Sequence, residues 1–231
     1  MTRSPAEDGL YVVGGGTGAL GSAVVSRLLG EERLVIVPVR PGSDPHLPPQ
    51  VRGIECDLSD PQAVEQFANT VASEGRWYAV INCSGGYASG LAHELENEQL
   101  LEQLDLNVLG PWRLAKAGAR AMIASGHGGR IVNVVSRSGE QPFAGQAGYQ
   151  LGKAALLRLT EVMALELQAH AITVNAVLPS VIDTPANRRS MPGADHSRWV
   201  PPGDIAAAIL WLLSTQTASV TGASLRVYGR S

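Results

Sequence analysis

Tyr149 and Lys153 are the two residues whose type and spacing point most directly to chemistry. The chain has only two lysines, Lys116 and Lys153, against sixteen arginines, and Lys153 follows Tyr149 by four residues. A phenol with an ordinary pKa of about 10 is a poor proton donor or acceptor at neutral pH. Residues i and i+4 share one face of a helix, so we expect the Lys153 ammonium beside the Tyr149 phenol, lowering its pKa. This spacing predicts that Tyr149 acts as a general acid and base.

A hydroxyl group precedes this pair in the sequence. Ser136 follows the apolar run 131–135 and stands thirteen residues before Tyr149. A serine at the end of a strand that faces the start of a helix is placed to hold a carbonyl oxygen while the tyrosine transfers a proton. The structural alternative is that Tyr149 packs a helix and Lys153 is solvated, and the pair alone does not decide between the two.

Short apolar runs alternate with longer helical patterns along the chain. The predicted strands are 10–13, 34–39, 53–56, 78–82, 131–135, 172–178 and 224–228. The predicted helices are 19–29, one that begins at Asp60-Pro61, 96–125, 148–169 and 204–214. Continuously apolar strands that alternate with helices predict an α/β fold: a Rossmann-type, doubly wound parallel sheet of about seven strands, with helices on both faces. We expect residues 1–231 to form a single domain.

Two segments fall outside this alternation. Residues 1–8 are a polar N-terminal tail that lacks the apolar stretch of a signal peptide. Residues 183–203 are rich in Pro, Arg and Ser and have no helical or strand periodicity. Because a loop of this length in a compact domain is usually functional, we expect it to be a lid over the substrate.

A glycine-rich segment joins the first predicted strand to the first predicted helix. Glycines permit a tight turn and a close approach to a pyrophosphate, and the start of the following helix attracts its negative charge. A position between a strand and a helix favours a dinucleotide site over a plain loop. The residues expected to contact this cofactor are Gly14, Gly16, Thr17, Gly18, Leu20 and Gly21.

Arg40 ends the second strand, where an NAD site normally places an acidic residue against the ribose 2′-hydroxyl. A guanidinium suits the 2′-phosphate of NADP instead, so NADP is the expected cofactor. Asp44, four residues later, leaves NAD as an alternative cofactor. The structural alternative for Arg40 is a surface arginine that only caps the end of the strand. Further cofactor contacts are expected at the carboxyl edge of the sheet from Asp57, Leu58, Asn82, Ser84 and Gly85.

In this order, the motifs resemble those of the short-chain dehydrogenase/reductase family over nearly the whole chain. Residues 14–21 are similar to the family's cofactor loop, and residues 82–85 to its Asn-Asn-Ala-Gly turn. The resemblance implies a catalytic tetrad of Asn107, Ser136, Tyr149 and Lys153, of which Tyr149 and Lys153 also contact the cofactor. It implies further cofactor contacts from Pro179, Ile182 and Thr184, in a turn where Ser180 replaces the usual glycine.

Two shorter patches, residues 85–90 and 183–192, resemble dihydropteridine reductases. Those enzymes have an acidic residue at the position of Arg40 and no serine at the position of Ser136. These two differences argue against a pteridine as the substrate. The resemblance to the wider short-chain dehydrogenase/reductase family instead implies hydride transfer between NADP(H) and a carbonyl, or an imine, of a small organic substrate. Pteridine reduction and a catalytically silent, cofactor-binding regulator are the alternatives. The residues expected around the substrate are Tyr87, Arg137, Ser138, Arg188 and Trp199.

Composition narrows the class of protein further. A net charge of −3 and a pI near 6.0 argue against a nucleic-acid-binding protein. No stretch is apolar enough to span a membrane, and the five histidines show no metal-ligand spacing. Cys56 and Cys83 are expected to be buried free thiols of a cytoplasmic protein. The family resemblance also implies a homodimer or homotetramer built on the helices around Asn107 and Tyr149.

Overall fold

The computed structural model describes residues 8–230, which contain one sheet of seven strands. The strands are β1 (Leu10–Gly14), β2 (Leu34–Val39), β3 (Arg52–Glu55), β4 (Trp77–Asn82), β5 (Gly129–Val134), β6 (Ile172–Pro179) and β7 (Ser224–Val227). They lie in the order β3-β2-β1-β4-β5-β6-β7, and every neighbouring pair is parallel. The strand order reverses between β1 and β4, the place where ligands bind in open α/β sheets. The expected Rossmann-type sheet is confirmed.

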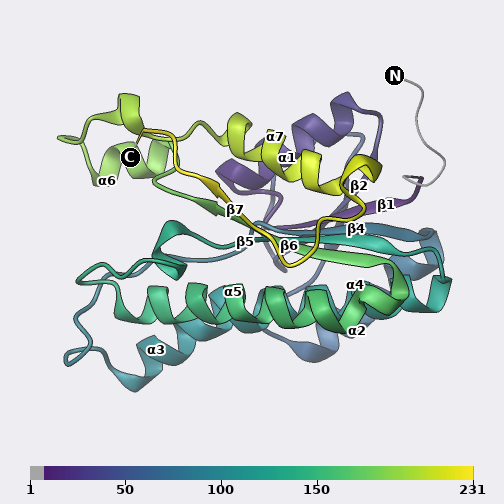
Figure 1. Ribbon diagram of the computed structural model, residues 1–231, viewed down its shortest axis with the longest axis horizontal. Coiled ribbons are helices and arrows are strands. Elements are labelled where there is room, and N and C mark those ends of the chain that lie inside the picture. The colour runs from purple at the N-terminus through teal and green to yellow at the C-terminus, as the bar shows by residue number, and fades with distance from the viewer. Residues whose placement is uncertain (1–7, 231) are drawn as a thin grey trace.

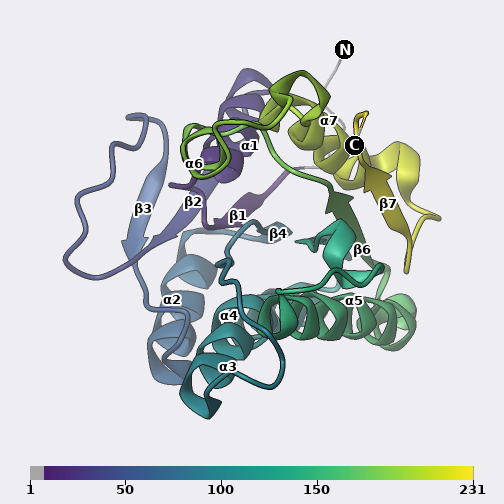
Figure 2. The same ribbon diagram turned by 90° about the vertical axis from the view of Figure 1, so that its left-hand side faces the viewer.

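Helices cover both faces of this sheet (Figure 1). On one face lie α1 (Ala19–Gly30) and α7 (Pro202–Leu213), and on the other α2 (Pro61–Glu74), α4 (Gly110–Ser125) and α5 (Ala147–Leu167). The shorter α3 (Asn97–Leu104) packs against α5. The carboxyl ends of the strands face the viewer in Figure 2, with α6 (Pro185–Ser190) on the same side as α1.

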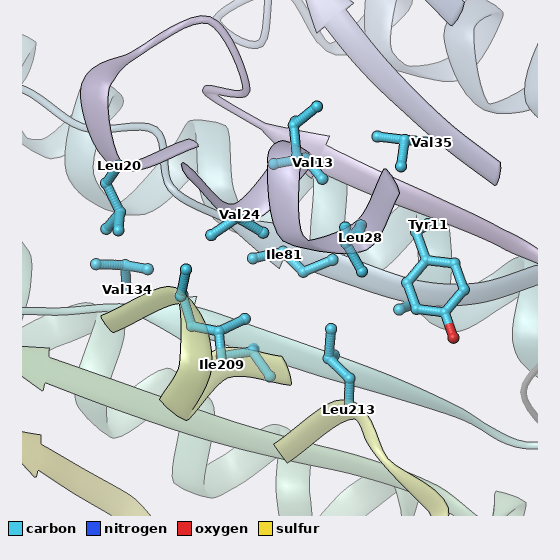
Figure 3. Packing of buried hydrophobic residues seen from close by; sticks show 14 of the residues in the cluster. Tyr11, Val13, Leu20, Val24, Leu28, Val35, Ile81, Val134, Ile209 and Leu213 are labelled. Carbon is cyan, nitrogen blue, oxygen red and sulfur yellow. The ribbon is translucent and has the colours of Figure 1, made fainter. Parts of the chain in front are cut away.

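The first face of the sheet is closed by direct packing of α1 on α7. Val24 and Leu28 of α1 meet Ile209 and Leu213 of α7 over Ile81 of β4, and each of these side chains is at most 3% exposed (Figure 3). Full burial of such a side chain stabilises a fold by about 1.5–3 kcal/mol. All residues of β4 and β6 are buried, which explains their unbroken apolar character and makes the sheet a rigid support for its edge.

The expected helical pattern over 96–125 is present, but it is not one regular α-helix. Between α3 and α4, residues Asp105–Leu109 form a π-helical segment. Pro111, in the first turn of α4, has no N–H to donate to the Asn107 carbonyl four residues earlier, which disfavours regular α-helical hydrogen bonding at this point. Segments of π-helix occur often at functional sites, and this one carries Asn107.

The expectation that residues 183–203 are irregular was wrong in part. Thr184 caps α6 by accepting a hydrogen bond from the Asn187 N–H at 3.1 Å, and Pro185 occupies the first helical position. A 3-10 helix follows at His196–Arg198, and Ile182 pairs with Val200 in a parallel bridge. Of the expected polar tail, residues 1–8, only Asp8 belongs to the part that the structure describes.

Candidate active site

The glycine-rich segment turns the chain from β1 into α1 at the carboxyl edge of the sheet. Gly15 has a left-handed backbone, with φ of 73°, and a Cβ atom there would lie 2.7 Å from the Ser84 nitrogen. A Cβ atom on Gly21 would lie 2.0 Å from the Gly15 carbonyl oxygen. Only glycine fits these two positions, and as a result the segment packs directly on the turn after β4.

The start of α1 fits an anionic group. The N-cap residue Gly18 offers no side-chain cap, and the first turn contains no acidic residue. The amides of this turn, including those of Leu20 and Gly21, therefore have no side-chain acceptor. The hydroxyl of Ser84 is buried and has no hydrogen-bond partner within residues 8–230. An uncapped helix start beside an orphaned hydroxyl matches what a dinucleotide pyrophosphate and ribose require.

The ends of β2 and β3 bring three more expected cofactor residues to this edge. Arg40 is exposed directly after β2. Asp57 accepts hydrogen bonds from the Ser59 N–H at 2.9 Å and the Ser59 hydroxyl at 2.8 Å, and these bonds, helped by the charge of Arg40, lower the pKa of its carboxyl group. The Leu58 carbonyl accepts a hydrogen bond from Arg113 Nη1 at 2.9 Å.

A cavity of about 630 Å³ lies along α1, from the glycine-rich segment to Leu29, and is closed on its other side by residues 43–48. Its lining includes Gly16 and Thr17 from the glycine-rich segment and Asp44 from the loop after β2. Asp44, the residue that leaves NAD as an alternative cofactor, therefore lines the same cavity as the glycine-rich segment.

Asn82, at the end of β4, is the centre of a buried chain of hydrogen bonds. Its Nδ2 donates to the Pro111 carbonyl at 3.0 Å and to Asn133 Oδ1 at 2.8 Å. Asn133 Nδ2 donates in turn to Thr160 Oγ1 at 2.9 Å. These three polar side chains are at most 1% exposed. These hydrogen bonds join β4, β5, α4 and α5. They therefore hold the turn after β4 in position relative to α5, the helix that carries Tyr149.

Ser136, Tyr149 and Lys153 meet where β5 ends and α5 begins. Lys153 Nζ lies 5.9 Å from the centre of the Tyr149 ring and donates a hydrogen bond to the Val134 carbonyl at 3.0 Å. Burial raises the pKa of Tyr149 above its ordinary value, although a hydrogen bond with Ser136 opposes this effect. The expected pairing is present, but the net shift of the Tyr149 pKa runs against our expectation, because burial outweighs the hydrogen bond with Ser136.

Burial also shifts the pKa values of two neighbours of Tyr149, Lys153 and Cys83. Lys153 is 5% exposed, and loss of solvation lowers its pKa to about 8, while Cys83 has a smaller, opposing effect. The same cause raises the pKa of the Cys83 thiol to about 12. Cys56 is buried as expected, but Cys83 is partly exposed as a residue although its thiol is enclosed.

Asn107 lies in the π-helical segment and clamps the chain after β4. The fully buried side chain donates from Nδ2 to the Gly86 carbonyl at 2.9 Å and accepts at Oδ1 from the Gly86 N–H at 3.2 Å. A Cβ atom on Gly85 would lie 2.8 Å from Asn107 Oδ1 and 3.1 Å from Lys153 Nζ. Asn107 and Lys153 therefore converge on one spot that only glycine leaves open.

The segment after β6 closes this edge of the sheet. β6 ends at Pro179, and the hydroxyl of Ser180 donates to the Tyr228 carbonyl at 2.8 Å. Ile182 and Thr184 continue towards α6, where Thr184 is the N-cap. The segment thus runs beside the end of β7 before it turns over the edge (Figure 2).

The expected substrate residues lie in different surroundings. The exposed ring of Tyr87 contacts that of Tyr149, with 5.2 Å between ring centres. Ser138 donates from its hydroxyl to Gln146 Oε1 at 3.1 Å. Arg137 lies directly after Ser136, stacked on aromatic rings.

Arg188 and Trp199 are occupied within the segment 183–203 itself. Arg188 donates from Nε and Nη2 to the Asp183 carboxylate at 2.5 and 2.8 Å. The ring of Trp199 is buried and lies 4.3 Å from that of His196, centre to centre. These contacts explain why the segment is ordered, but they leave both side chains little freedom to meet a substrate.

Sequence reasoning missed several residues of this edge. Asn133 carries a local signal, because it is the single polar residue in an otherwise apolar strand end, Ile131 to Val134. Glu140 lies on a segment that was expected at this edge, but its hydrogen bond with Arg226, 86 residues away, has no local signal in the sequence.

The comparison with known families identifies this arrangement. Residues 10–194 match the family model described as short chain dehydrogenase, a span that includes Asn107, Ser136, Tyr149 and Lys153. The chain belongs to the short-chain dehydrogenase/reductase family. It is therefore an oxidoreductase of a family that binds a nicotinamide cofactor.

Several members of the short-chain dehydrogenase/reductase family are similar over nearly their whole length. The short-chain reductase protein NovJ of Streptomyces niveus is 32% identical, with 94% of this chain and 91% of the relative covered. Galactitol 2-dehydrogenase of Rhizobium johnstonii is also 32% identical, with 94% and 92% covered. A variant of actinorhodin polyketide ketoreductase solved with NADPH superimposes with a TM-score of 0.86 at 25% identity, covering 98% of both chains. These names include both a reductase and a dehydrogenase.

Within residues 8–230, no helix is long and apolar enough to cross a bilayer. In the same residues, no three His, Cys, Asp or Glu side chains gather as metal ligands would.

Proposed function

We propose that this protein is an NADPH-dependent reductase that transfers hydride to the carbonyl of a small organic substrate, or to an imine. The observation that carries the proposal is the convergence of Ser136, Tyr149 and Lys153 beside the uncapped start of α1. Carbonyl reduction requires a proton donor next to a site that can hold a nicotinamide dinucleotide, and this edge of the sheet combines the two.

The residues at this edge divide into contacts for each part of the cofactor. The start of α1 would hold the pyrophosphate, and Arg40 the 2′-phosphate. The nicotinamide end would meet Tyr149, Lys153 and the turn after β6. When bound, the cofactor supplies the hydride. The complete proposed set is Gly14, Gly16, Thr17, Gly18, Leu20, Gly21, Arg40, Asp57, Leu58, Asn82, Ser84, Gly85, Tyr149, Lys153, Pro179, Ile182 and Thr184.

Tyr149 would move the proton. Because burial raises its pKa, the phenol keeps its proton at neutral pH, which is the protonation state that reduction needs. The Ser136 hydroxyl would hold the substrate oxygen while the phenol donates to it. Lys153, whose pKa is lowered only to about 8, is still mostly charged at pH 7 and would stabilise the phenolate that results. Asn107 would act by holding the chain at Gly86.

NADP is favoured over NAD by Arg40, since a guanidinium makes charged hydrogen bonds with a phosphate. The similar actinorhodin ketoreductase holds NADPH, which supports the same choice. We retain NAD as the alternative because Asp44 shares the cavity beside the glycine-rich segment.

The assembly and setting belong to the proposal as well. Residues 1–231 would form one cofactor-binding domain, with 183–203 as its lid, in a cytoplasmic homodimer or homotetramer. Three apolar side chains on one stripe of α5 remain exposed: Leu151 at 51%, Val162 at 40% and Leu165 at 72%. An apolar stripe of this kind suits an interface between identical subunits.

The substitution Tyr149→Phe tests the proposal. We expect turnover to fall by about 10²–10⁴-fold, the usual cost of losing a positioned general acid, while NADPH affinity is kept because the ring stays. The assay follows NADPH oxidation with a panel of ketones, aldehydes and one dihydropteridine. Tyr11→Phe, which removes a hydroxyl near the opposite edge of the sheet, should retain turnover.

The possible results separate the alternatives. Activity with the dihydropteridine alone would favour pteridine reduction. NADPH binding without turnover of any compound by the wild-type protein would favour a silent regulator. Near-normal turnover in Tyr149→Phe would exclude Tyr149 as the proton donor.

A further inference from the structure

Arg137 is held in a fixed orientation directly after Ser136. Its guanidinium carbon lies 5.6 Å from the centre of the Phe143 ring and 5.2 Å from the centre of the Tyr228 ring. Its Nε donates to Gln141 Oε1 at 2.9 Å. Two rings and one hydrogen bond therefore set the plane of the guanidinium before any ligand arrives.

The terminal nitrogens of Arg137 are left available. No carboxylate in residues 8–230 forms an ion pair with Arg137, and its Nη groups have no hydrogen-bond partner there. Glu140 is the one acidic residue between Ser136 and Tyr149. It accepts hydrogen bonds from Arg226 Nε at 2.8 Å and from the Tyr228 hydroxyl at 2.9 Å.

These bonds commit Glu140 to other partners. The hydrogen bonds from Arg226, the largest cause, lower the pKa of Glu140 to about 2, so the carboxylate is ionised and already paired at neutral pH. No acidic side chain of residues 137–148, the segment between Ser136 and Tyr149, therefore neutralises the positive charge of Arg137.

The position of Arg137 relates it to the proposed reaction centre. Its Cα atom is about 3.8 Å from that of Ser136, as for any consecutive residues. The Ser138 N–H donates to the Ser136 hydroxyl oxygen at 3.1 Å, which fixes this turn. The Tyr228 carbonyl accepts from Ser180, so the ring under Arg137 is tied to the turn after β6. Arg137 thus joins the turn after β5 to Tyr228, the residue that follows β7, and through it to the turn after β6.

We propose that Arg137 recognises an anionic oxygen group, a carboxylate or a phosphate, on a substrate whose carbonyl oxygen is held by Ser136 and Tyr149. A stacked guanidinium presents parallel N–H groups that match the oxygens of either anion. The exposed ring of Tyr87 beside Tyr149 offers an apolar surface for the carbon skeleton. The substrate class is therefore a carbonyl compound that carries an acidic group. The inference rests on the proposed function for the carbonyl step, but the anion contact can be tested without turnover.

Calorimetric titration of benzoate, phenyl phosphate and benzamide tests the contact, with the free and the NADP-saturated protein. We expect the better anion to bind at least about tenfold more tightly than neutral benzamide, at the lower end of the range for charged hydrogen bonds because the site is partly open. Whichever anion binds more tightly identifies the group as a carboxylate or a phosphate. Arg137→Gln should abolish the preference for an anion. Arg137→Lys, which keeps the charge without the planar fork, should retain only part of it.

A matched control removes a positive charge elsewhere. Arg27→Gln lies in the last turn of α1, an exposed position at the opposite edge of the sheet, and should leave the preference unchanged. Equal affinity for anion and amide, no binding of either anion, or an unchanged preference in Arg137→Gln would each overturn the inference.

Two further measurements keep the inference separate from the proposed function. NADPH affinity, measured for every variant, should equal that of the wild type if the fold is intact. If the wild type binds no NADPH, the proposed function fails, whereas titration of the free protein still decides the anion contact. For a substrate pair such as 4-acetylbenzoate and its methyl ester, Arg137→Gln should raise KM about tenfold for the acid only, with kcat little changed.

Discussion

Lys153 shows how burial changes the chemistry of a single residue. Its ammonium is enclosed against the Val134 carbonyl, and its pKa of about 8 lies well below the ordinary value of 10.5. The two titratable neighbours shift the other way: the Cys83 thiol has a pKa of about 12, and the pKa of Tyr149 is raised. Of the three groups, Lys153 alone changes its charge near pH 8.

NADPH affinity should therefore fall as the pH rises through about 8. The protonated lysine donates hydrogen bonds to a cofactor ribose and attracts the anionic dinucleotide, so binding is strongest below the pKa and weakens as the lysine loses its proton. Fluorescence titrations between pH 6.5 and 9.5 measure this dependence. Lys153→Met should bind NADPH more weakly and show no step in this range. A step of equal size in the variant would assign it to another group.

Arg40 should set the choice between the two dinucleotides. Arg40→Asp should weaken NADPH binding by about tenfold or more and improve NADH binding, because a carboxylate repels the 2′-phosphate and accepts from the 2′-hydroxyl. Parallel titrations with both cofactors measure the ratio. Asp44→Asn serves as the control and should leave the preference for NADPH in place. Equal affinity of the wild type for both cofactors would contradict the NADP assignment.

Among the elements, α6 is held more weakly than the strands beneath it. Its N-cap residue Thr184 is buried, but the Arg188–Asp183 pair is exposed to solvent and none of the residues of α6 itself is buried. β6, which precedes it, is buried throughout. Ends and short surface elements with few buried contacts open at low free energy.

Hydrogen exchange should show this difference directly. Amides of residues 185–190 should exchange much faster than those of β6 in the free protein and gain protection when NADPH and substrate are bound, since the segment would close over the edge. Exchange in β6 serves as the internal reference and should not change. Strong protection of residues 185–190 in the free protein would identify the segment as a fixed part of the scaffold.

For the whole molecule, the apolar stripe on α5 is a surface that an interface between identical subunits would cover. Leu165 is its most exposed member, at 72%. Leu165→Glu should shift the protein from oligomer to monomer, because an unpaired charge in an apolar interface is costly to desolvate. Light scattering coupled to size-exclusion chromatography measures the mass. Leu34→Glu, an exposed leucine at the start of β2, is the control. A monomeric wild type would contradict the predicted assembly.

The sequence by itself determined the order of the elements, the parallel sheet and the local motifs of the site. These features depend on neighbouring residues: apolar strands buried on two faces, glycines where a Cβ atom would clash, and a lysine four residues after a tyrosine. The family followed from the same motifs and was confirmed. The sequence did not show that the helical residues 97–125 include a π-helical segment at Asn107, and it did not show the short helix within 183–203.

Only the tertiary structure decided how these groups act on one another. The hydrogen bonds between Asn82, Asn133 and Thr160 join residues far apart in the sequence, as does the pairing of Glu140 with Arg226. The pKa values of Tyr149 and Lys153 depend on how much solvent the assembled sheet and helices remove from each group, which no spacing of residues encodes. Burial is a property of the packed chain, and it set the protonation states on which the proposed chemistry rests.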